Sequence, residues 1–328
     1  MKQPVPSKAM QETLERLAVE DAGLPDPTTM DPETGRLQAA RANRRWNEVA
    51  DLSARVSVER LTITGGNGQP AACRLYRPFD AGPEGAVLHI HGGGWAFCDL
   101  DTHERASRML ALACRVPVLS CKYRQAPENP FPSGLDDCRA AWAALAGGFQ
   151  GLKGPFAIAG DSAGANLAIA VMLAQAARGE RLPDAGLLFY GVYGANFETP
   201  SYVAHADGPG LTRAKMMRYW NWYAGPELRD DPLAVPLAAS DEQLAGLPPL
   251  YISAAAVDVL RSDSEALFAR LKALGRSDHY RLHDGVVHGF MQMSSELEEA
   301  RLAFDHAGEA FRALCRLGTA NHRKKEDA

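Results

Sequence analysis

The stretch "GPFAIAGDSAGANLAIAV", residues 154–171, joins two kinds of local structure at one serine. Its first half is a short apolar run typical of a buried strand, and its second half is a longer run of small and apolar residues typical of a helix. Between the two lies a G-x-S-x-G pattern centred on Ser162. A sharp strand-to-helix turn exposes such a serine hydroxyl above the sheet, and its flanking glycines leave room for the chain. The stretch therefore predicts that Ser162 is a nucleophile.

The chain on both sides of this stretch alternates apolar strand-like runs with helical segments. Examples of the former are "GAVLHIHG", "VPVLSCKYR" and "PPLYISAAA", and of the latter "THERASRMLALAC" and "SEALFARLKALG". The alternation predicts an α/β fold with a mostly parallel central sheet flanked by helices on both faces. Residues 195–235 interrupt it with a segment crowded with aromatic residues and methionines. Two interpretations fit this insertion: a lid over a site, or a surface helix pair with a packed aromatic seam.

Composition narrows the class of protein. The chain has 328 residues, of which 46% are hydrophobic and 23% charged, and its net charge of −5 argues against nucleic-acid binding. None of the six cysteines forms a C-x-x-C pair, which indicates buried free thiols in a reducing compartment. The N-terminus has no apolar signal-peptide core, and no run is long enough for membrane insertion. We therefore expect a cytoplasmic protein, with residues 317–328 as a solvated tail.

A serine nucleophile needs a base, usually a histidine oriented by a carboxylate, and after a turn of this kind the chain order is serine, acid, histidine. His288, in "DGVVHGFMQM", follows the last strand-like run and is the predicted base. In "PLYISAAAVDVLRSDSEALF", Asp258 follows a strand directly, whereas Asp263 begins a helix and suits a first-turn carboxylate. We therefore predict the catalytic set Ser162, Asp258 and His288.

The stretch "HIHGGGWAF", residues 89–97, is the other unusual segment. A phosphate loop would need a following Lys-Ser/Thr, and a metal site at the two histidines would need further ligands, so neither interpretation finds support. Acyl transfer needs backbone N–H groups that bind an oxyanion, and a glycine loop after an earlier strand supplies them. The predicted oxyanion hole comprises Gly92, Gly93, Gly94 and Ala163, with Gly93 and Gly94 favoured.

Together these motifs resemble the bacterial hormone-sensitive-lipase-like (family IV) carboxylesterases of the α/β-hydrolase fold. "HGGGW" and "GDSAG" match two signatures of that family, and "KYRQAPENPFPSGLDDC" resembles a third. "DVL" and "HGF" match the contexts of its acid and base. Three positions depart from the common pattern: Gln125 stands where leucine is usual, Ala165 where a glycine is frequent, and Ser262 where an acid is frequent. None of the three touches the predicted chemistry.

The resemblance implies a division of the chain into a catalytic core and a helical cap. The core would comprise residues 50–194 and 236–316, and the cap residues 1–49 and 195–235. By the same resemblance the cap lies over Ser162, and an aromatic and methionine set in the insertion, which also includes Met216 and Tyr219, supplies part of the pocket. The substrate pocket is predicted from Trp95, Asp161, Leu211, Met217, Trp220 and Phe290. Each aromatic residue fits an ordinary core position equally well.

We therefore predict a serine hydrolase that cleaves short- to medium-chain acyl esters through an acyl-enzyme, with no metal and no cofactor. The same residues would serve an amide, lactone or carbamate substrate. A non-catalytic small-molecule receptor on this fold is the alternative from another class, although such a receptor would be expected to have lost one of the three catalytic groups. The predicted partner is a small ester, and a homodimer formed through a sheet edge is left open.

Overall fold

The computed structural model of the protein describes the backbone of residues 3–82 and 84–326, and side chains up to residue 315. The strands are β1 (Val56–Thr64), β2 (Pro70–Pro78), β3 (Ala86–Ile90), β4 (Val118–Cys121), β5 (Phe156–Asp161), β6 (Ala185–Phe189), β7 (Leu250–Val257) and β8 (His279–Val287). The α-helices are α1 (Lys8–Glu20), α2 (Pro32–Asn43), α3 (Ala50–Ser53), α4 (Glu104–Cys114), α5 (Ser133–Ala146), α6 (Ala163–Arg178), α7 (Pro200–Ala204), α8 (Arg213–Tyr223), α9 (Asp241–Ala245), α10 (Arg261–Ala273) and α11 (Glu298–Glu326). Short 3₁₀ turns include η1 (Pro27–Thr29), η2 (Arg44–Trp46) and η6 (Phe290–Met293).

The strands form one sheet in the order β1-β2-β4-β3-β5-β6-β7-β8. The pairs β1–β2 and β2–β4 are antiparallel, and every pair from β4 to β8 is parallel. Parallel strands need covered faces because the crossover helices lie on both sides of the sheet. The predicted mostly parallel sheet flanked by helices is confirmed.

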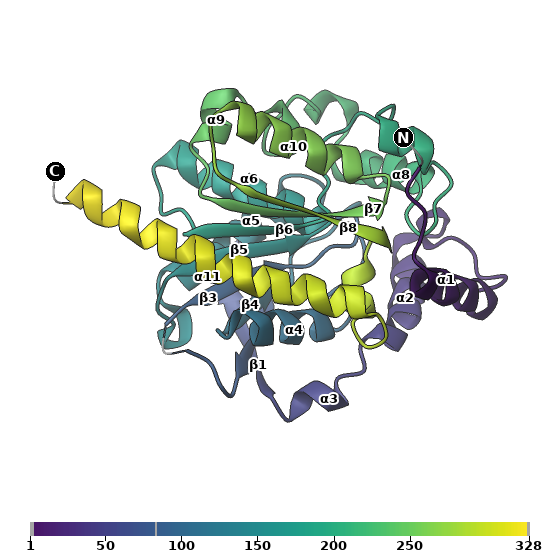
Figure 1. Ribbon diagram of the computed structural model, residues 1–328, viewed down its shortest axis with the longest axis horizontal. Helices are drawn as coiled ribbons and strands as arrows, with labels where there is room; N and C mark the ends of the chain where they lie inside the picture. The colour runs from purple at the N-terminus through teal and green to yellow at the C-terminus, as the bar shows by residue number, and fades with distance from the viewer. Residues whose placement is uncertain (1–2, 83, 327–328) are drawn as a thin grey trace.

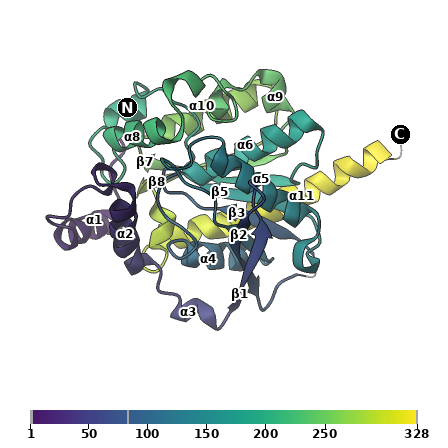
Figure 2. The same cartoon turned by 180° about the vertical axis from the view of Figure 1, so that it is seen from behind.

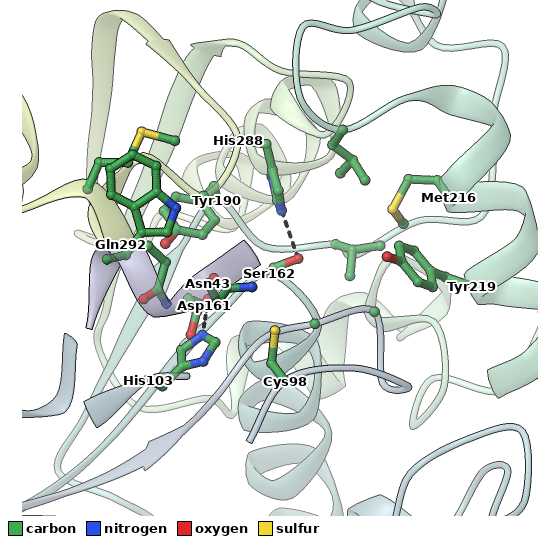
Figure 3. Close-up of a pocket in the computed structure, with 17 residues that line it drawn as sticks. Asn43, Cys98, His103, Asp161, Ser162, Tyr190, Met216, Tyr219, His288 and Gln292 are labelled. Carbon is green, nitrogen blue, oxygen red and sulfur yellow. Dashed lines mark hydrogen bonds and ion pairs between the residues drawn. The ribbon is translucent and has the colours of Figure 1, made fainter. Parts of the chain in front are cut away.

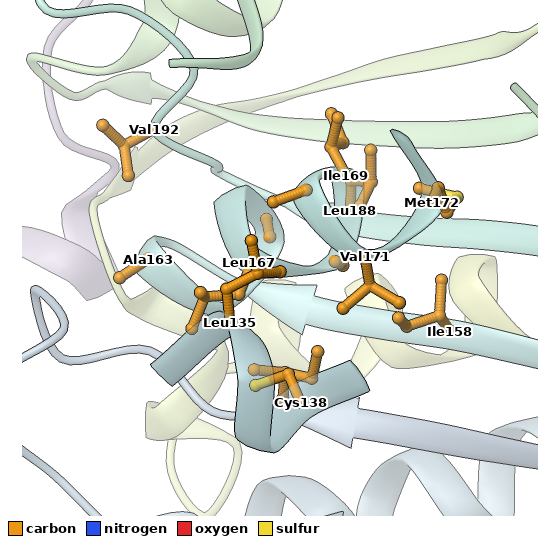
Figure 4. Close-up of a cluster of buried hydrophobic side chains, with 14 of the residues drawn as sticks. Leu135, Cys138, Ile158, Ala163, Leu167, Ile169, Val171, Met172, Leu188 and Val192 are labelled. Carbon is orange, nitrogen blue, oxygen red and sulfur yellow. The ribbon is translucent and has the colours of Figure 1, made fainter. Parts of the chain in front are cut away.

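Alternate residues of each central strand face different helical layers. On β3, Leu88 packs into the core formed with α5, α6 and α10, whereas Val87 belongs to the core formed with α4 and α11. On β5, Ile158 and Ala157 divide in the same way. Figure 4 shows the first of these cores, where side chains of α5 and α6 meet those of β5 and β6. This two-sided burial explains why the strands read as continuous apolar runs rather than alternating ones.

The helices α1, α2 and α8 lie at one end of the molecule. In Figures 1 and 2, α1 and α2 lie beside the outer part of the body, below α8. Arg218 of α8 joins the two groups, because it donates to Asp26 Oδ2 at 3.0 Å and to Thr28 Oγ1 at 2.8 Å. Segments almost two hundred residues apart in sequence are therefore in contact there.

The C-terminal helix α11 packs on α4 through its first half and extends away from the body in Figure 1. The predicted tail, residues 317–328, begins inside this helix, and residues 327–328 lie outside the described part of the chain. Within the described residues, no helix combines the length and apolarity needed to cross a membrane.

Candidate active site

Ser162 lies between the end of β5 and the start of α6, in a backbone conformation that L-residues rarely adopt. Its φ is 55° and its ψ is −119°, and only 8% of its surface is exposed. The flanking glycines permit the turn because a Cβ on Gly160 would lie 2.2 Å from the carbonyl oxygen of Gly164. A Cβ on Gly164 would lie 2.0 Å from the carbonyl oxygen of Ile90 on the neighbouring strand. Close backbone packing on both sides of Ser162 thus maintains its strained backbone conformation.

His288 and Asp258 complete a hydrogen-bonded chain with this serine. The imidazole Nε2 lies 2.9 Å from Ser162 Oγ, as Figure 3 shows, and Nδ1 lies 2.7 Å from Asp258 Oδ2. The other oxygen of Asp258 accepts the backbone N–H of Leu260 at 3.0 Å, and the residue is 2% exposed. Each of the three residues directly follows a parallel strand, β5, β7 or β8, so one edge of the sheet brings them together.

Asp263, the other candidate acid, has a different environment. Its Oδ2 accepts the backbone N–H groups of Tyr193 and Gly194 at 2.9 and 2.8 Å. Burial raises its pKa to about 7, partly offset by these two hydrogen bonds, and the nearby Asp258 carboxylate acts in the same direction as burial. The structure gives no hydrogen bond between Asp263 and His288. The Asp263 carboxyl group therefore holds the loop after β6.

The glycine loop after β3 divides the predicted oxyanion donors into two kinds. The N–H of Gly92 donates to Asp161 Oδ1 at 3.0 Å and so is already used. The N–H groups of Gly93, Gly94 and Ala163 find no acceptor among the described residues. Gly93 and Gly94 have φ values of 110° and 59°, and a Cβ on Gly93 would lie 2.1 Å from the carbonyl oxygen of Phe97. Glycine at position 93 is therefore required by both conformation and space.

A buried carboxylate fixes this loop against the serine turn. Besides Gly92, Asp161 contacts His103 Nε2 at 3.3 Å and His89 Nε2 at 3.5 Å. Burial opposes ionisation of Asp161, but its contacts with His103 and His89 outweigh burial and hold the pKa of the carboxyl well below its usual range. The charged Asp161 carboxylate, next to the nucleophile, thus connects β5, the glycine loop and the start of α4 through its contacts.

His91, the second histidine of "HIHGGGWAF", shapes the same loop. Its Nδ1 lies 2.8 Å from the carbonyl oxygen of Gly92, and its ring stacks on Tyr123 at 4.4 Å between centroids. The Tyr123 hydroxyl in turn donates to the backbone oxygen of His91 at 3.1 Å. Burial lowers the pKa of His91 to about 3, so the ring is neutral. Within the described residues, no group of three or more His, Cys, Asp or Glu side chains could hold a metal ion.

A cavity of about 250 Å³ opens onto Ser162. It is lined by Asn43, Trp46, Gly93, Gly94, Cys98, His103, Asp161, Ser162, Tyr190, Val192, Leu211, Met216, Tyr219, His288, Gly289, Gln292 and Met293. Two kinds of contributor meet there. The first group of lining residues follows strands of the sheet. The second group comes from α2, η2, the loop before α8, and α8 itself.

The predicted pocket residues take different places. Asp161 and Leu211 line the cavity, as do Met216 and Tyr219 from the aromatic and methionine set. Met217, by contrast, is 43% exposed on the outer face of α8. Trp95, Trp220 and Phe290 are buried away from the cavity. The two tryptophans pack on each other at 4.8 Å between centroids, and Trp95 also stacks on Tyr223 at 4.2 Å. Phe290 packs on Tyr190 at 5.8 Å.

The sequence motifs did not indicate several of the lining residues. Asn43 and Trp46 come from the N-terminal segment, and Gln292 and Met293 from the turn that follows His288. No local pattern distinguishes them, because their position depends on how helices far apart in sequence pack. One departure from the family pattern has a visible role: Gln125 Nε2 donates to the carbonyl oxygens of Phe97 and Cys98 at 2.9 and 2.8 Å.

Comparison with known proteins shows to which family the chain is similar. A family model described as alpha/beta hydrolase fold matches residues 87–292. The carboxylesterase NlhH of Mycobacterium tuberculosis (strain ATCC 25618 / H37Rv) is 34% identical over 282 residues, which cover 82% of this chain and 86% of that protein. The ethyl acetate hydrolase of Pseudomonas putida is 31% identical over 277 residues, which cover 80% of this chain and 86% of that protein.

Solved structures show the same likeness over almost the whole chain. A thermostable esterase from Pseudomonas putida ECU1011 aligns with a TM-score of 0.87 and 31% identity, covering 96% of this chain and 99% of its own. A hyperthermophilic esterase from the archaeon Pyrobaculum calidifontis aligns with a TM-score of 0.85 and 31% identity, covering 94% of this chain and 99% of its own.

Proposed function

This chain belongs to the α/β-hydrolase family and, within it, to the hormone-sensitive-lipase-like carboxylesterases, and on that premise we propose that Ser162 hydrolyses short- to medium-chain acyl esters. The predicted serine ester hydrolase is confirmed at the level of the family and reaction class. The residues that perform the reaction and the size of the substrate are the further content of the proposal. One observation carries it: Ser162, His288 and Asp258 form a hydrogen-bonded chain, and its serine and histidine line a cavity.

In the first half of the reaction, Ser162 Oγ attacks the ester carbonyl carbon while His288 Nε2, 2.9 Å away, takes the hydroxyl proton. Asp258, 2.7 Å from Nδ1, orients the ring and stabilises the imidazolium that forms. The carbonyl oxygen becomes an oxyanion, which the free N–H groups of Gly93, Gly94 and Ala163 bind. Gly92 is left out of this role because its N–H donates to Asp161.

The tetrahedral intermediate collapses when the imidazolium gives its proton to the leaving alkoxide, and an acyl-enzyme remains on Ser162. Water then enters, His288 removes one of its protons, and the hydroxide attacks the acyl carbon. The same oxyanion donors act a second time, and Ser162 recovers its proton as the carboxylic acid leaves. The second half thus repeats the first with water in place of serine.

The proposed cap comprises residues 1–49 and 195–235. Its support is that both segments contribute to the cavity wall, with Asn43 and Trp46 from the first and Leu211, Met216 and Tyr219 from the second. The size of the cavity, about 250 Å³, suits substrates with short to medium acyl chains better than long-chain lipids. A cytoplasmic location is proposed from the six free cysteines. The homodimer through a sheet edge stays a prediction.

Replacement of Ser162 by alanine tests the proposal. We expect kcat for nitrophenyl butyrate to fall roughly 10⁶-fold, with the circular dichroism spectrum unchanged. A fluorescent alkyl phosphonate should label the wild-type protein at Ser162, located by mass spectrometry, and should not label the variant. Unimpaired turnover by Ser162→Ala would overturn the assignment. A wild-type protein that takes up no label and cleaves no ester would favour the receptor alternative.

A further inference from the structure

A guanidinium group from the N-terminal segment contacts the chain just beyond the glycine loop. Arg36 of α2 donates through Nε to the carbonyl oxygen of Ala96 at 2.8 Å, and through Nη2 to that of Ala126 at 2.8 Å. Glu128 binds the same guanidinium, because its carboxylate oxygens lie 2.9 Å from Nη1 and 2.5 Å from Nη2. Every nitrogen of the group is therefore used, although the reaction described above gives Arg36 no role.

The place of Ala96 in the chain gives this contact its significance. The chain from Gly93 to Phe97 forms a tight turn, in which the carbonyl oxygen of Gly93 accepts the N–H groups of Ala96 at 3.1 Å and Phe97 at 2.8 Å. The N–H of Phe97 belongs to the same peptide group as the carbonyl that Arg36 binds. In the same way, the carbonyl of Gly93 belongs to the same peptide group as the N–H of Gly94. Gly94 lines the cavity, and its N–H finds no acceptor within the described chain.

Two peptide groups thus connect the positive charge of Arg36 to the Gly94 N–H. Both peptide bonds, 93–94 and 96–97, are trans. A trans peptide group holds its C=O and its N–H in one plane and in opposite directions, so a donor bound to the oxygen fixes where the N–H points. Hydrogen bonds in such a chain polarise one another, and a charged donor at its start is stronger than a neutral one.

Further contacts hold α2 and the core against the same turn. A Cβ on Gly35 of α2 would lie 3.1 Å from the ring of Phe97, so the helix and the turn are closely packed. From the core side, the N–H of Ala126 donates at 3.0 Å to the carbonyl oxygen of Trp95, whose peptide group carries the N–H of Ala96. The guanidinium binds both of these backbone segments, because it contacts Ala96 and Ala126 together.

Arg36 differs from the other side chain that binds the backbone of this turn. Within the described chain, two side chains donate to the carbonyl oxygens of residues 93–98, and the second is the neutral Gln125. Gln125 binds the carbonyls of Phe97 and Cys98, and neither of those peptide groups donates to Gly93. The charge and the connection to the Gly94 N–H therefore both belong to Arg36.

We propose that Arg36 is a positioning residue of the oxyanion hole, which acts through two peptide groups to orient the Gly94 N–H and to strengthen it as a donor. When negative charge develops on the substrate oxygen, the Gly94 N–H binds that oxygen, and the positive charge of Arg36 stabilises it from the other end of the chain. No proton moves along the chain, because each peptide group keeps its N–H. The inference rests on the proposed function, since it assigns a residue to the Ser162 reaction.

The first test is Arg36→Met, which keeps the length of the side chain and removes its charge and its hydrogen bonds. We expect kcat for nitrophenyl butyrate to fall about tenfold, less than the 10²- to 10³-fold loss of a whole donor, with KM within about twofold of the wild-type value. Arg36→Lys keeps the charge but cannot bind two carbonyl groups as the planar guanidinium does, and its kcat should fall about threefold. An unchanged kcat in both variants would overturn the inference.

The matched control is Arg270→Met. Arg270 of α10 also binds two backbone carbonyl oxygens, those of Leu237 and Ala239 at 2.8 Å each, and a carboxylate oxygen of Asp241 at 2.6 Å. These contacts do not include the glycine loop, so this variant should keep the wild-type kcat. An equal fall in kcat in the two methionine variants would contradict a specific role for Arg36.

A transition-state analogue separates an effect on the oxyanion from a general loss of structure. With an alkyl trifluoromethyl ketone, Ser162 Oγ adds to the carbonyl carbon, the serine proton passes to His288, and the carbonyl oxygen becomes a hemiketal oxyanion. The corresponding secondary alcohol has the same carbon chain and forms no oxyanion. Arg36→Met should raise the Ki of the ketone about tenfold and leave the Ki of the alcohol within about twofold. Equal changes in the two Ki values, or an unchanged Ki for the ketone, would overturn the inference.

Two further measurements keep the outcome decisive. If Arg36→Met does not fold, Arg36→Lys gives the same pair of Ki values, with an expected rise of about threefold for the ketone, and an unchanged pair again overturns the inference. Loss of activity in Ser162→Ala separates the two hypotheses. If that variant is inactive while the Arg36 variants keep the wild-type kcat and Ki values, the proposed function stands and only the role of Arg36 fails.

Discussion

The cavity at Ser162 is built from two groups of residues that reach it in different ways. The strand-end residues, Gly93, Gly94, Ser162 and His288, follow parallel strands closely and are placed by the backbone of the sheet. The residues of the proposed cap (the cap group) come from two segments whose helices are held by side-chain contacts; they are Asn43, Trp46, Leu211, Met216 and Tyr219. On the proposed function, the first group performs acyl transfer, and the second group forms the remaining part of the cavity wall.

The two groups also differ in how strongly each position is determined. Around the strand-end residues, a Cβ added to Gly160, Gly164 or Gly93 would meet backbone atoms within 2.2 Å, so no other residue fits. In the cap group, neighbouring residues of one helix have opposite surroundings: Met216 is 2% exposed and Met217 is 43% exposed. The difference predicts that substitutions in the first group abolish or sharply reduce turnover, whereas those in the second alter selectivity.

The largest effect within this comparison should come from Asp258→Asn. Asparagine keeps the shape of the side chain but can donate an N–H to His288 Nδ1. That hydrogen bond disfavours the tautomer whose Nε2 accepts the Ser162 proton. We therefore expect kcat to fall roughly 10⁴-fold. The measurement is steady-state cleavage of nitrophenyl butyrate. The matched control is Asp263→Asn, which still accepts the Tyr193 and Gly194 N–H groups through its side-chain oxygen. An equal loss of activity in both variants would contradict the assignment of Asp258, rather than Asp263, as the acid that orients His288.

The boundary between the two groups can be tested at Gly94. A Cβ there would lie 2.5 Å from the ring of Tyr219, so Gly94→Ala forces the glycine loop and α8 apart and moves an oxyanion donor. We expect kcat to fall about 10²- to 10³-fold, the usual effect of losing one such donor. Tyr219→Ala should restore part of the activity in the double variant, because it removes the ring that the new methyl group meets.

The matched control for this experiment is Gly179→Ala. Gly179 ends α6 with a φ of 63°, close to the 59° of Gly94, but a Cβ at position 179 would meet no atom within 4 Å. This variant carries the same backbone strain without the clash, and it should turn over ester at the wild-type rate. If the two alanine variants lose activity equally, strain rather than the contact with Tyr219 accounts for the loss.

The same contrast explains which parts of the molecule could be predicted from the sequence. The sheet, the strand-to-helix turn at Ser162 and the positions of Asp258 and His288 follow from local patterns, because a strand end and a glycine leave little choice of conformation. The roles of Trp95, Trp220 and Phe290 do not. An aromatic residue near the site can line the cavity or support its wall, and the apolar pattern is the same in both cases. Asn43 and Gln292 carry no local signal, since only the tertiary packing brings α2 and η6 to one cavity.

The smallest effect should come from the paired substitutions Met216→Ala and Met217→Ala, which ask whether α8 sets the size of the substrate. Met216 lines the cavity, so its truncation enlarges the space beside Ser162 by several methylene groups. We expect kcat/KM for acetate and butyrate esters to fall about tenfold relative to octanoate, because short chains lose contact with the wall and longer chains gain room.

Met217 is exposed on the other face of α8, and its alanine variant should keep the wild-type chain-length profile. A series of nitrophenyl esters from acetate to octanoate measures both profiles. Identical profiles in the two variants would show that α8 does not form the wall against which the ester chain lies. The proposed cap would then control access to the cavity rather than its size.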